Sequence, residues 1–112
     1  MATKIQLQKI SLALPEATEE PHFDKTSFRV KGKIFATYND KEKWATLRFT
    51  PEEQAMFCKI GDYIFPVPNA WGRLGWTHIR IGKIKVEVLK ELLKAAYIVV
   101  APKKLAETVK DR

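Results

Sequence analysis

The sequence has little cysteine and no long apolar run. Cys58 is the single cysteine among 112 residues, so no disulfide can form within the chain. Such sparing use of cysteine is typical of proteins from reducing compartments. No apolar stretch approaches the roughly 20 residues that cross a bilayer, and residues 1–8 lack the apolar core of a signal peptide. We therefore expect a cytoplasmic protein with no membrane association.

Catalytic chemistry is also scarce. Residues 72–75 do not form a phosphate-binding loop, because such a loop follows a strand and opens a helix. His22 lies near Glu20 and Asp24, but their spacing does not put three metal ligands on one face, and a turn histidine is the favoured interpretation. Cys58 falls within an amphipathic helix, where a small buried residue is the usual role. We expect no enzymatic activity, no metal site and no cofactor.

Positive charge, in contrast, is abundant. Lys and Arg number 20 and Asp and Glu number 13, which gives a formal net charge of +7. This surplus favours contact with polyanions such as nucleic acid, an anionic membrane or an acidic protein. The alternative is a surface charge that serves solubility alone.

The length fits one domain, residues 1–112. Ala55, Met56 and Ile60, with Phe57 or Cys58 as further candidates, are expected on the buried side of a helix that begins after Thr50 and ends before Gly61. Grouped strands and helices indicate an α+β domain of two layers, with a twisted antiparallel sheet and helices packed on one face. Apolar spacing, caps and turn residues predict, in chain order, a helix (4–14), a polar connector (15–26), a two-stranded hairpin (27–30 and 33–38), a strand (44–49), the helix after Thr50, an extended segment (63–67), a strand (76–81), a long helix (85–101) and a short terminal helix.

Two of the predicted strands carry aromatic and cationic residues on the same face. If alternate residues of strand 44–49 face the helices, the opposite face bears Trp44, Thr46 and Arg48. Alternate residues of strand 76–81 form a similar set on one face of that strand. Such a face suits base stacking combined with phosphate contact. The alternative is that both tryptophans are covered by a loop and the arginines are ordinary solvated residues. The second strand contributes Trp76, His78 and Arg80, and Arg29, Lys33 or Phe35 of the hairpin join the face if its register allows.

The segment 66–78 joins these strands and contains two of the three tryptophans, two prolines and two glycines. We expect it to be a rigid structural loop with Trp71 packed inward, so that Trp71→Ala costs roughly 2–4 kcal/mol. Gly72 and Gly75 are expected to need backbone angles closed to other residues, and Pro68 and Ala70 complete this structural motif. Arg73 either presents its guanidinium outward or holds the loop shut through backbone carbonyls.

The order of several motifs resembles the MmcQ/YjbR family. The resemblance rests on the hairpin 28–36, on Pro51-Glu52-Glu53-Gln54, on the loop 68–77 and on the helix end 100–105, and it covers essentially the whole chain. It implies a fold similar to the CyaY/frataxin-like and secretion-chaperone-like architectures, and a family commonly labelled DNA-binding. It supplies no catalytic residues. Frataxin-like iron binding is not implied, because that depends on an acidic ridge and this chain has no acidic residue before Glu16.

Three functions from different classes remain open. The leading one is a small non-enzymatic domain, monomer or weak dimer, that binds nucleic acid, in particular DNA. The second is a protein-interaction or chaperone-like module that docks a partner or a second copy through the Trp-rich loop. The third is a small-molecule binder or enzyme with a pocket between that loop and His22. The expected nucleic-acid contacts are Arg29, Lys33, Trp44, Arg48, Arg73, Trp76, His78 and Arg80.

Overall fold

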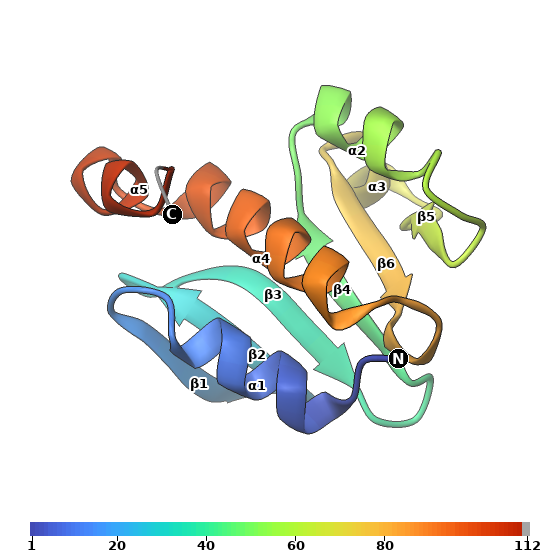
Figure 1. Cartoon of the computed structure of the whole chain (residues 1–112), viewed down its shortest axis with the longest axis horizontal. Coiled ribbons are helices and arrows are strands. Elements are labelled where there is room, and N and C mark those ends of the chain that lie inside the picture. The colour runs from blue at the N-terminus through green and yellow to red at the C-terminus, as the bar shows by residue number, and fades with distance from the viewer. Residues whose placement is uncertain (111–112) are drawn as a thin grey trace.

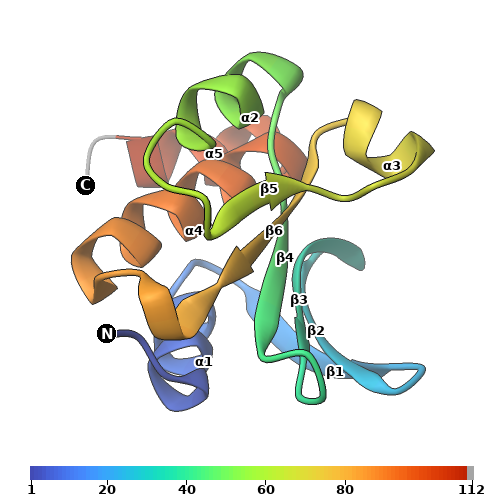
Figure 2. The same ribbon diagram turned by 90° about the vertical axis from the view of Figure 1, so that its right-hand side faces the viewer.

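The computed structural model describes residues 1–110 and consists of one antiparallel sheet with its longer helices on one face, while the four-residue helix at residues 70–73 lies beside the other face (Figures 1 and 2). The strand order is β1-β2-β3-β4-β6-β5. This arrangement confirms the predicted α+β class. None of the helices in residues 1–110 is long and apolar enough to cross a membrane. The elements are α1 (Lys4–Leu12), β1 (Ala17–His22), β2 (Lys25–Val30), β3 (Lys33–Asn39), β4 (Trp44–Arg48), α2 (Pro51–Phe57), β5 (Ile64–Pro66), α3 (Ala70–Arg73), β6 (Trp76–Arg80), a 3-10 turn (Ile81–Lys83), α4 (Val86–Val100) and α5 (Lys103–Lys110).

Local capping and turn signals set several of these boundaries. At the start of α2, the Thr50 hydroxyl accepts from the Glu53 backbone N–H at 3.1 Å, and the Glu53 carboxylate accepts from the Thr50 backbone N–H at 3.0 Å. This reciprocal pair satisfies two donors that the helix leaves free. Between β2 and β3, Lys31 and Gly32 have φ values of +52° and +80°, as a tight two-residue hairpin turn requires. These expectations are confirmed.

The predicted polar connector 15–26 is wrong, because half of it forms the edge strand β1 and its last two residues begin β2. β1 pairs antiparallel with β2 from Ala17↔Val30 to His22↔Lys25. Its four central residues are exposed, so the strand shows no alternation of apolar and polar residues. Pro21 is tolerated there because an edge strand leaves half of its backbone donors unpaired.

Helix α2 also differs from expectation, because its apolar residues face solvent. Ala55, Met56 and Ile60 are exposed. Phe57 and Cys58, the further candidates, are partly buried against the core, and the Phe57 ring packs edge-on against Phe49 with 4.8 Å between centroids. The helix ends at Phe57 after seven residues, so it has one short buried edge.

The core lies between the sheet and α4, which crosses it (Figures 1 and 2). Phe35 of β3 is fully buried and packs edge-on against Tyr97 of α4 at 5.6 Å. The Tyr97 hydroxyl donates to the carbonyl of Pro15 at 2.7 Å, which ties the end of α4 to the segment between α1 and β1. Other fully buried side chains come from both layers: Phe28, Leu47, Ile79, Leu89 and Leu93.

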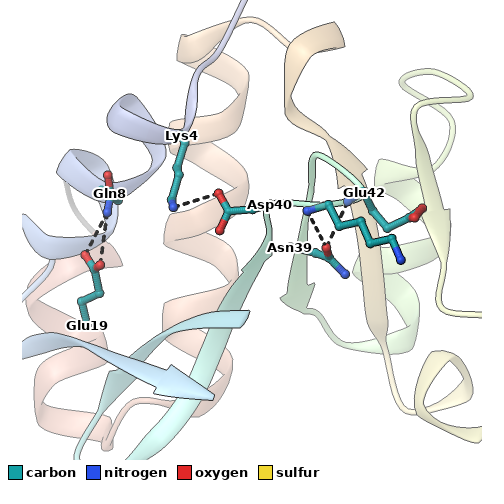
Figure 3. Close-up of polar contacts among 7 residues, drawn as sticks. Lys4, Gln8, Glu19, Asn39, Asp40 and Glu42 are labelled. Carbon is teal, nitrogen blue, oxygen red and sulfur yellow. Dashed lines mark hydrogen bonds and ion pairs between the residues drawn. The ribbon is translucent and has the colours of Figure 1, made fainter. Parts of the chain in front are cut away.

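Polar contacts hold α1 against the sheet (Figure 3). The Lys4 ammonium lies 2.9 Å from the Asp40 carboxylate, and the Gln8 amide donates to the Glu19 carboxylate of β1 at 3.1 Å. In the turn between β3 and β4, the Asn39 side-chain oxygen accepts two backbone N–H groups at 3.0 Å each. The hydrogen bonds thus connect α1 with the edge strand and with the turn that leads into β4.

Candidate functional site

The face of the sheet opposite the helices carries three cross-strand pairs between β4 and β6. Trp44 pairs with Arg80, and Arg48 pairs with Trp76. Between them, Thr46 pairs with His78. Because the strands are antiparallel, each tryptophan is opposite an arginine, and directly opposed residues share a face. The sequence parity that predicted this shared face is confirmed; nothing in the structure tests a ligand on it.

Both arginines lie over aromatic rings. The Arg80 guanidinium carbon is 5.2 Å from the Trp44 ring centroid and 5.6 Å from that of Phe65. The Arg48 guanidinium carbon is 5.6 Å from the Trp76 ring centroid. Cation–π contacts of this kind are worth about 0.5–1 kcal/mol at exposed sites. They hold the two guanidinium groups in place before any ligand arrives.

His78 is the centre of an aromatic cluster. Its ring stacks on Trp44 with 4.1 Å between centroids, and Phe65 packs edge-on against both rings at 5.4 and 5.7 Å. Its Nδ1 lies 2.8 Å from the Thr46 hydroxyl. Burial, with a smaller contribution from the Arg80 charge, lowers the pKa of His78 to about 4. His78 is therefore neutral at pH 7 and contributes a planar surface and no charge.

The arginines of this face have no carboxylate partners within residues 1–110. Arg29 is directly opposite Ile34 and donates from Nε to the Ser27 hydroxyl at 2.9 Å. Arg29, Arg48 and Arg80 form no ion pair with the described carboxylates. The buried Arg48 Nε and Trp76 Nε1 also lack a hydrogen-bond acceptor among the described residues. Unpaired cationic and donor groups on one surface favour an anionic ligand.

Two hairpin residues do not belong to this face. Lys33 is directly opposite Val30, whose side chain is fully buried toward the helices. The register shifts at Phe28/Arg29, so a β-bulge lets both Phe35 and Ala36 point into the core. Lys33 as a member of the outer face is a wrong prediction, because the bulge changes the parity of β3.

A groove of about 460 Å³ runs along the outer face. It lies between α3 with its preceding loop on one side and the β1–β2 hairpin on the other, which bracket this face of the sheet (Figure 2). Within the described chain, none of the lining residues is acidic. Arg73 is exposed on α3 and does not line the groove. The lining residues are His22, Lys25, Ile34, Thr37, Thr46, Val67, Trp71, Trp76 and His78.

The expectation that Trp71 packs inward is wrong. Trp71 is 60% exposed and lines the groove from α3. Gly72 takes the buried position in this one-turn helix, and a Cβ there would overlap with the Val67 carbonyl oxygen. The backbone of the loop is thus packed tightly through glycine, while the indole next to it projects into the groove.

Gln54 of α2 holds the loop in place, a role that the sequence did not reveal. Its side-chain N–H groups face the carbonyl oxygens of Gly72 and Trp76 and the Thr77 hydroxyl at 3.0–3.1 Å. The Thr77 hydroxyl donates in turn to the Gly75 carbonyl at 2.9 Å. Gly75 has φ +114°, and a Cβ there would overlap with the Phe49 carbonyl oxygen. Gly75 therefore meets the expected need for a special angle, whereas Gly72 is required by close approach alone.

Sequence reasoning also missed Phe65 of the aromatic cluster and part of the groove lining. Phe65 pairs with His78 and joins the cluster, but β5 has only three residues and too short an alternation to assign a face. Thr37 lines the groove from the position opposite Thr46, and Lys25 from the position opposite His22. The sequence offered one signal for Thr37: strand alternation puts it on the same face as Thr46, its cross-strand partner.

Comparisons with known proteins agree with this fold. The chain resembles the crystal structure of Deinococcus radiodurans protein DR2400, a DUF419 domain, with a TM-score of 0.79 and 21% identity over 97% of this chain and 88% of that chain. At this identity the likeness shows the fold. A comparison with curated proteins gives no match. The family model described as YjbR matches residues 12–98, which include both aromatic strands and the Trp-rich loop. The chain belongs to the YjbR family.

Proposed function

We propose that this protein is a non-enzymatic nucleic-acid-binding domain, with DNA as its ligand, and that it binds through the outer face of the sheet. The observation that carries the proposal is the pair of reciprocal contacts Trp44–Arg80 and Trp76–Arg48 on one open face. The family label points the same way. Arginine binds phosphate with two parallel donors, and aromatic rings accept bases.

The electrostatics of the face support an anionic ligand. Lys25 lines the groove, whose lining within residues 1–110 contains no carboxylate. Arg48 lies over the lining residue Trp76 and Arg29 is opposite the lining residue Ile34, while Arg80 lies further along the same face, opposite Trp44. The Glu42 carboxylate in the β3–β4 turn raises the pKa of His78, against the effects of burial and of Arg80. Glu42 lies outside the groove lining. Because stacked guanidinium groups lose less freedom on binding, they suit phosphate contact better than free lysines.

The direct test is the salt dependence of binding. Anisotropy of a labelled oligodeoxynucleotide is measured over a salt series with the unmodified protein and with Arg48→Ala/Arg80→Ala. We expect weaker binding and a salt slope reduced by about 1 for each lost phosphate contact. The matched control is Lys103→Ala/Lys104→Ala on α5, which removes the same charge from an exposed helix. Absence of binding at low salt, or equal losses in both variants, contradicts the proposal.

A second candidate is docking of a protein partner through the Trp-rich loop. The observation that favours it is the exposure of two large apolar side chains on and beside α3, Trp71 at 60% and Leu74 at 51%. A stoichiometric protein partner that resists nuclease treatment and is lost on Trp71→Ala/Leu74→Ala supports this candidate. A bound partner that disappears on nuclease treatment and in Arg48→Ala/Arg80→Ala supports nucleic acid instead.

A further inference from the structure

We infer that the outer groove receives the planar base of an unpaired nucleotide in a single strand, with Trp71 as its stacking surface. This inference rests on the proposed function and specifies the form of nucleic acid. The groove volume of about 460 Å³ falls within the range of roughly 300–1,000 Å³ seen for small-molecule sites. In a duplex, neighbouring bases cover both faces of each base, so only an unpaired base can enter.

The walls of the groove match the flat face and the polar edge of a nucleotide base. Trp71 supplies aromatic surface from the loop side, and Trp76 supplies it from β6. Ile34, Thr37 and Thr46 form the sheet side, where apolar contact alternates with hydroxyl groups that can meet the polar edge of a base. Arg48 lies over Trp76 and Arg29 is opposite Ile34, so a base in the groove leaves its phosphates near these two cations.

The opposite wall ends in an exposed aromatic tip. Phe23, at the turn between β1 and β2, is 92% exposed and packs edge-on against His22, which lines the groove, at 4.8 Å. Its φ of +60° is rare for a bulky residue and costs free energy. The exposed Phe23 side chain adds nothing to the packing of the core, and neither does its strained backbone conformation. Phe23 therefore provides a second stacking surface for the nucleotide next to the one in the groove.

Lys25 completes the site on the hairpin side. Its ammonium lies 3.5 Å from the exposed Asp24 carboxylate, a weak surface pair that a phosphate can displace. Lys25 lines the groove together with His22 from the paired position on β1. The hairpin thus brings a cation and an aromatic tip to the same end of the groove.

The test compares single-stranded oligothymidylate, a duplex containing the same strand, and free thymidine monophosphate, by anisotropy or by competition. We expect Trp71→Ala to weaken single-strand binding about 5- to 100-fold, the loss that corresponds to one base–aromatic stack. Duplex binding is expected to stay within about 2-fold of the unmodified protein. Free thymidine monophosphate is expected to compete much more weakly than the strand, because it lacks the flanking phosphates.

Two further variants separate stacking from general damage. Trp71→Phe keeps a planar ring and is expected to retain single-strand affinity within about 3-fold, while the ligand-dependent quenching of tryptophan fluorescence decreases. Leu74→Ala removes a similarly exposed apolar side chain that does not line the groove, and is expected to bind normally. Because Trp71 is exposed, thermal unfolding of the alanine variant checks that its fold is intact.

The outcomes distinguish this inference from the proposed function. If Trp71→Ala weakens single-strand and duplex binding equally, or neither, the unpaired-base assignment is wrong, while salt-dependent binding through Arg48 and Arg80 still stands. If free thymidine monophosphate binds as tightly as the strand, the ligand is a mononucleotide and the single-strand assignment is overturned. If no nucleic acid binds at low salt, both the inference and the proposed function are wrong.

Discussion

The imidazole of His78 lies nearly parallel to the indole of Trp44, with 19° between the ring planes and 4.1 Å between their centroids. This stack, together with Phe65, shields part of the imidazole from water. Desolvation disfavours the charged form, which is the main cause of the lowered pKa. The site therefore places a neutral, hydrogen-bonded ring between two arginines that stay charged.

The first prediction concerns the pH dependence of stability. The pKa of His78 falls from its ordinary 6.5 to about 4 in the folded state, so between these values the unfolded chain binds more protons. The stabilising contribution of neutral His78 is complete above pH 6.5 and is lost as the pH falls toward 4. Urea unfolding across this window is expected to show a shallower pH dependence for His78→Gln than for the unmodified protein. Identical slopes would show that His78 titrates normally.

The second prediction concerns the stability role of Trp71. Because its side chain is 60% exposed, Trp71→Ala is expected to lower the free energy of unfolding by no more than about 1 kcal/mol. Phe35→Ala is the comparison, since it empties a buried site and is expected to cost about 3–5 kcal/mol. Chemical denaturation of both variants measures the difference. Comparable losses would mean that the indole is buried after all.

The third prediction concerns Gly75. Alanine there must adopt φ near +114° and displace the Phe49 carbonyl, so Gly75→Ala is expected to destabilise by about 1–3 kcal/mol or more. Gly82 is the matched control, because a Cβ there meets no atom within 4 Å. Gly82→Ala is expected to change the unfolding free energy by less than about 0.5 kcal/mol. Equal tolerance at both positions, measured by urea unfolding, would contradict the close approach.

The fourth prediction concerns the hydrogen bonds of Gln54. Gln54→Met keeps the length of the side chain but removes both N–H donors, and is expected to cost about 1–3 kcal/mol because three partly buried hydrogen bonds are lost, each worth about 0.5–1.5 kcal/mol. Gln54→Glu is expected to cost more, since a carboxylate would face carbonyl oxygens. Glu52→Ala, on the exposed side of the same helix, serves as the control. Hydrogen exchange in residues 72–77 should accelerate in the Gln54 variants alone.

Local signals predicted most of the elements, and long-range packing explains the errors. Capping at Thr50 and the turn at Lys31-Gly32 depend on residues within four positions of each other, so the sequence shows them directly. β1 has no such pattern, because its four central residues are exposed and it is held by pairing with β2 and by the contact of Glu19 with Gln8 of α1. The bulge in β3 is also a property of pairing, and it moved Lys33 to the other face.

By itself the sequence determined the α+β class and the parity that puts Trp44, Arg48, Trp76 and Arg80 on one face, because strand alternation is a local property of the backbone. Only the tertiary structure decided the register that pairs each tryptophan with an arginine, the neutral state of His78 and the exposure of Trp71. These depend on contacts between residues far apart in the chain. The Gln54 side chain contacts three acceptors that lie 18 to 23 positions further along the chain. These contacts hold the loop in its orientation beside the groove.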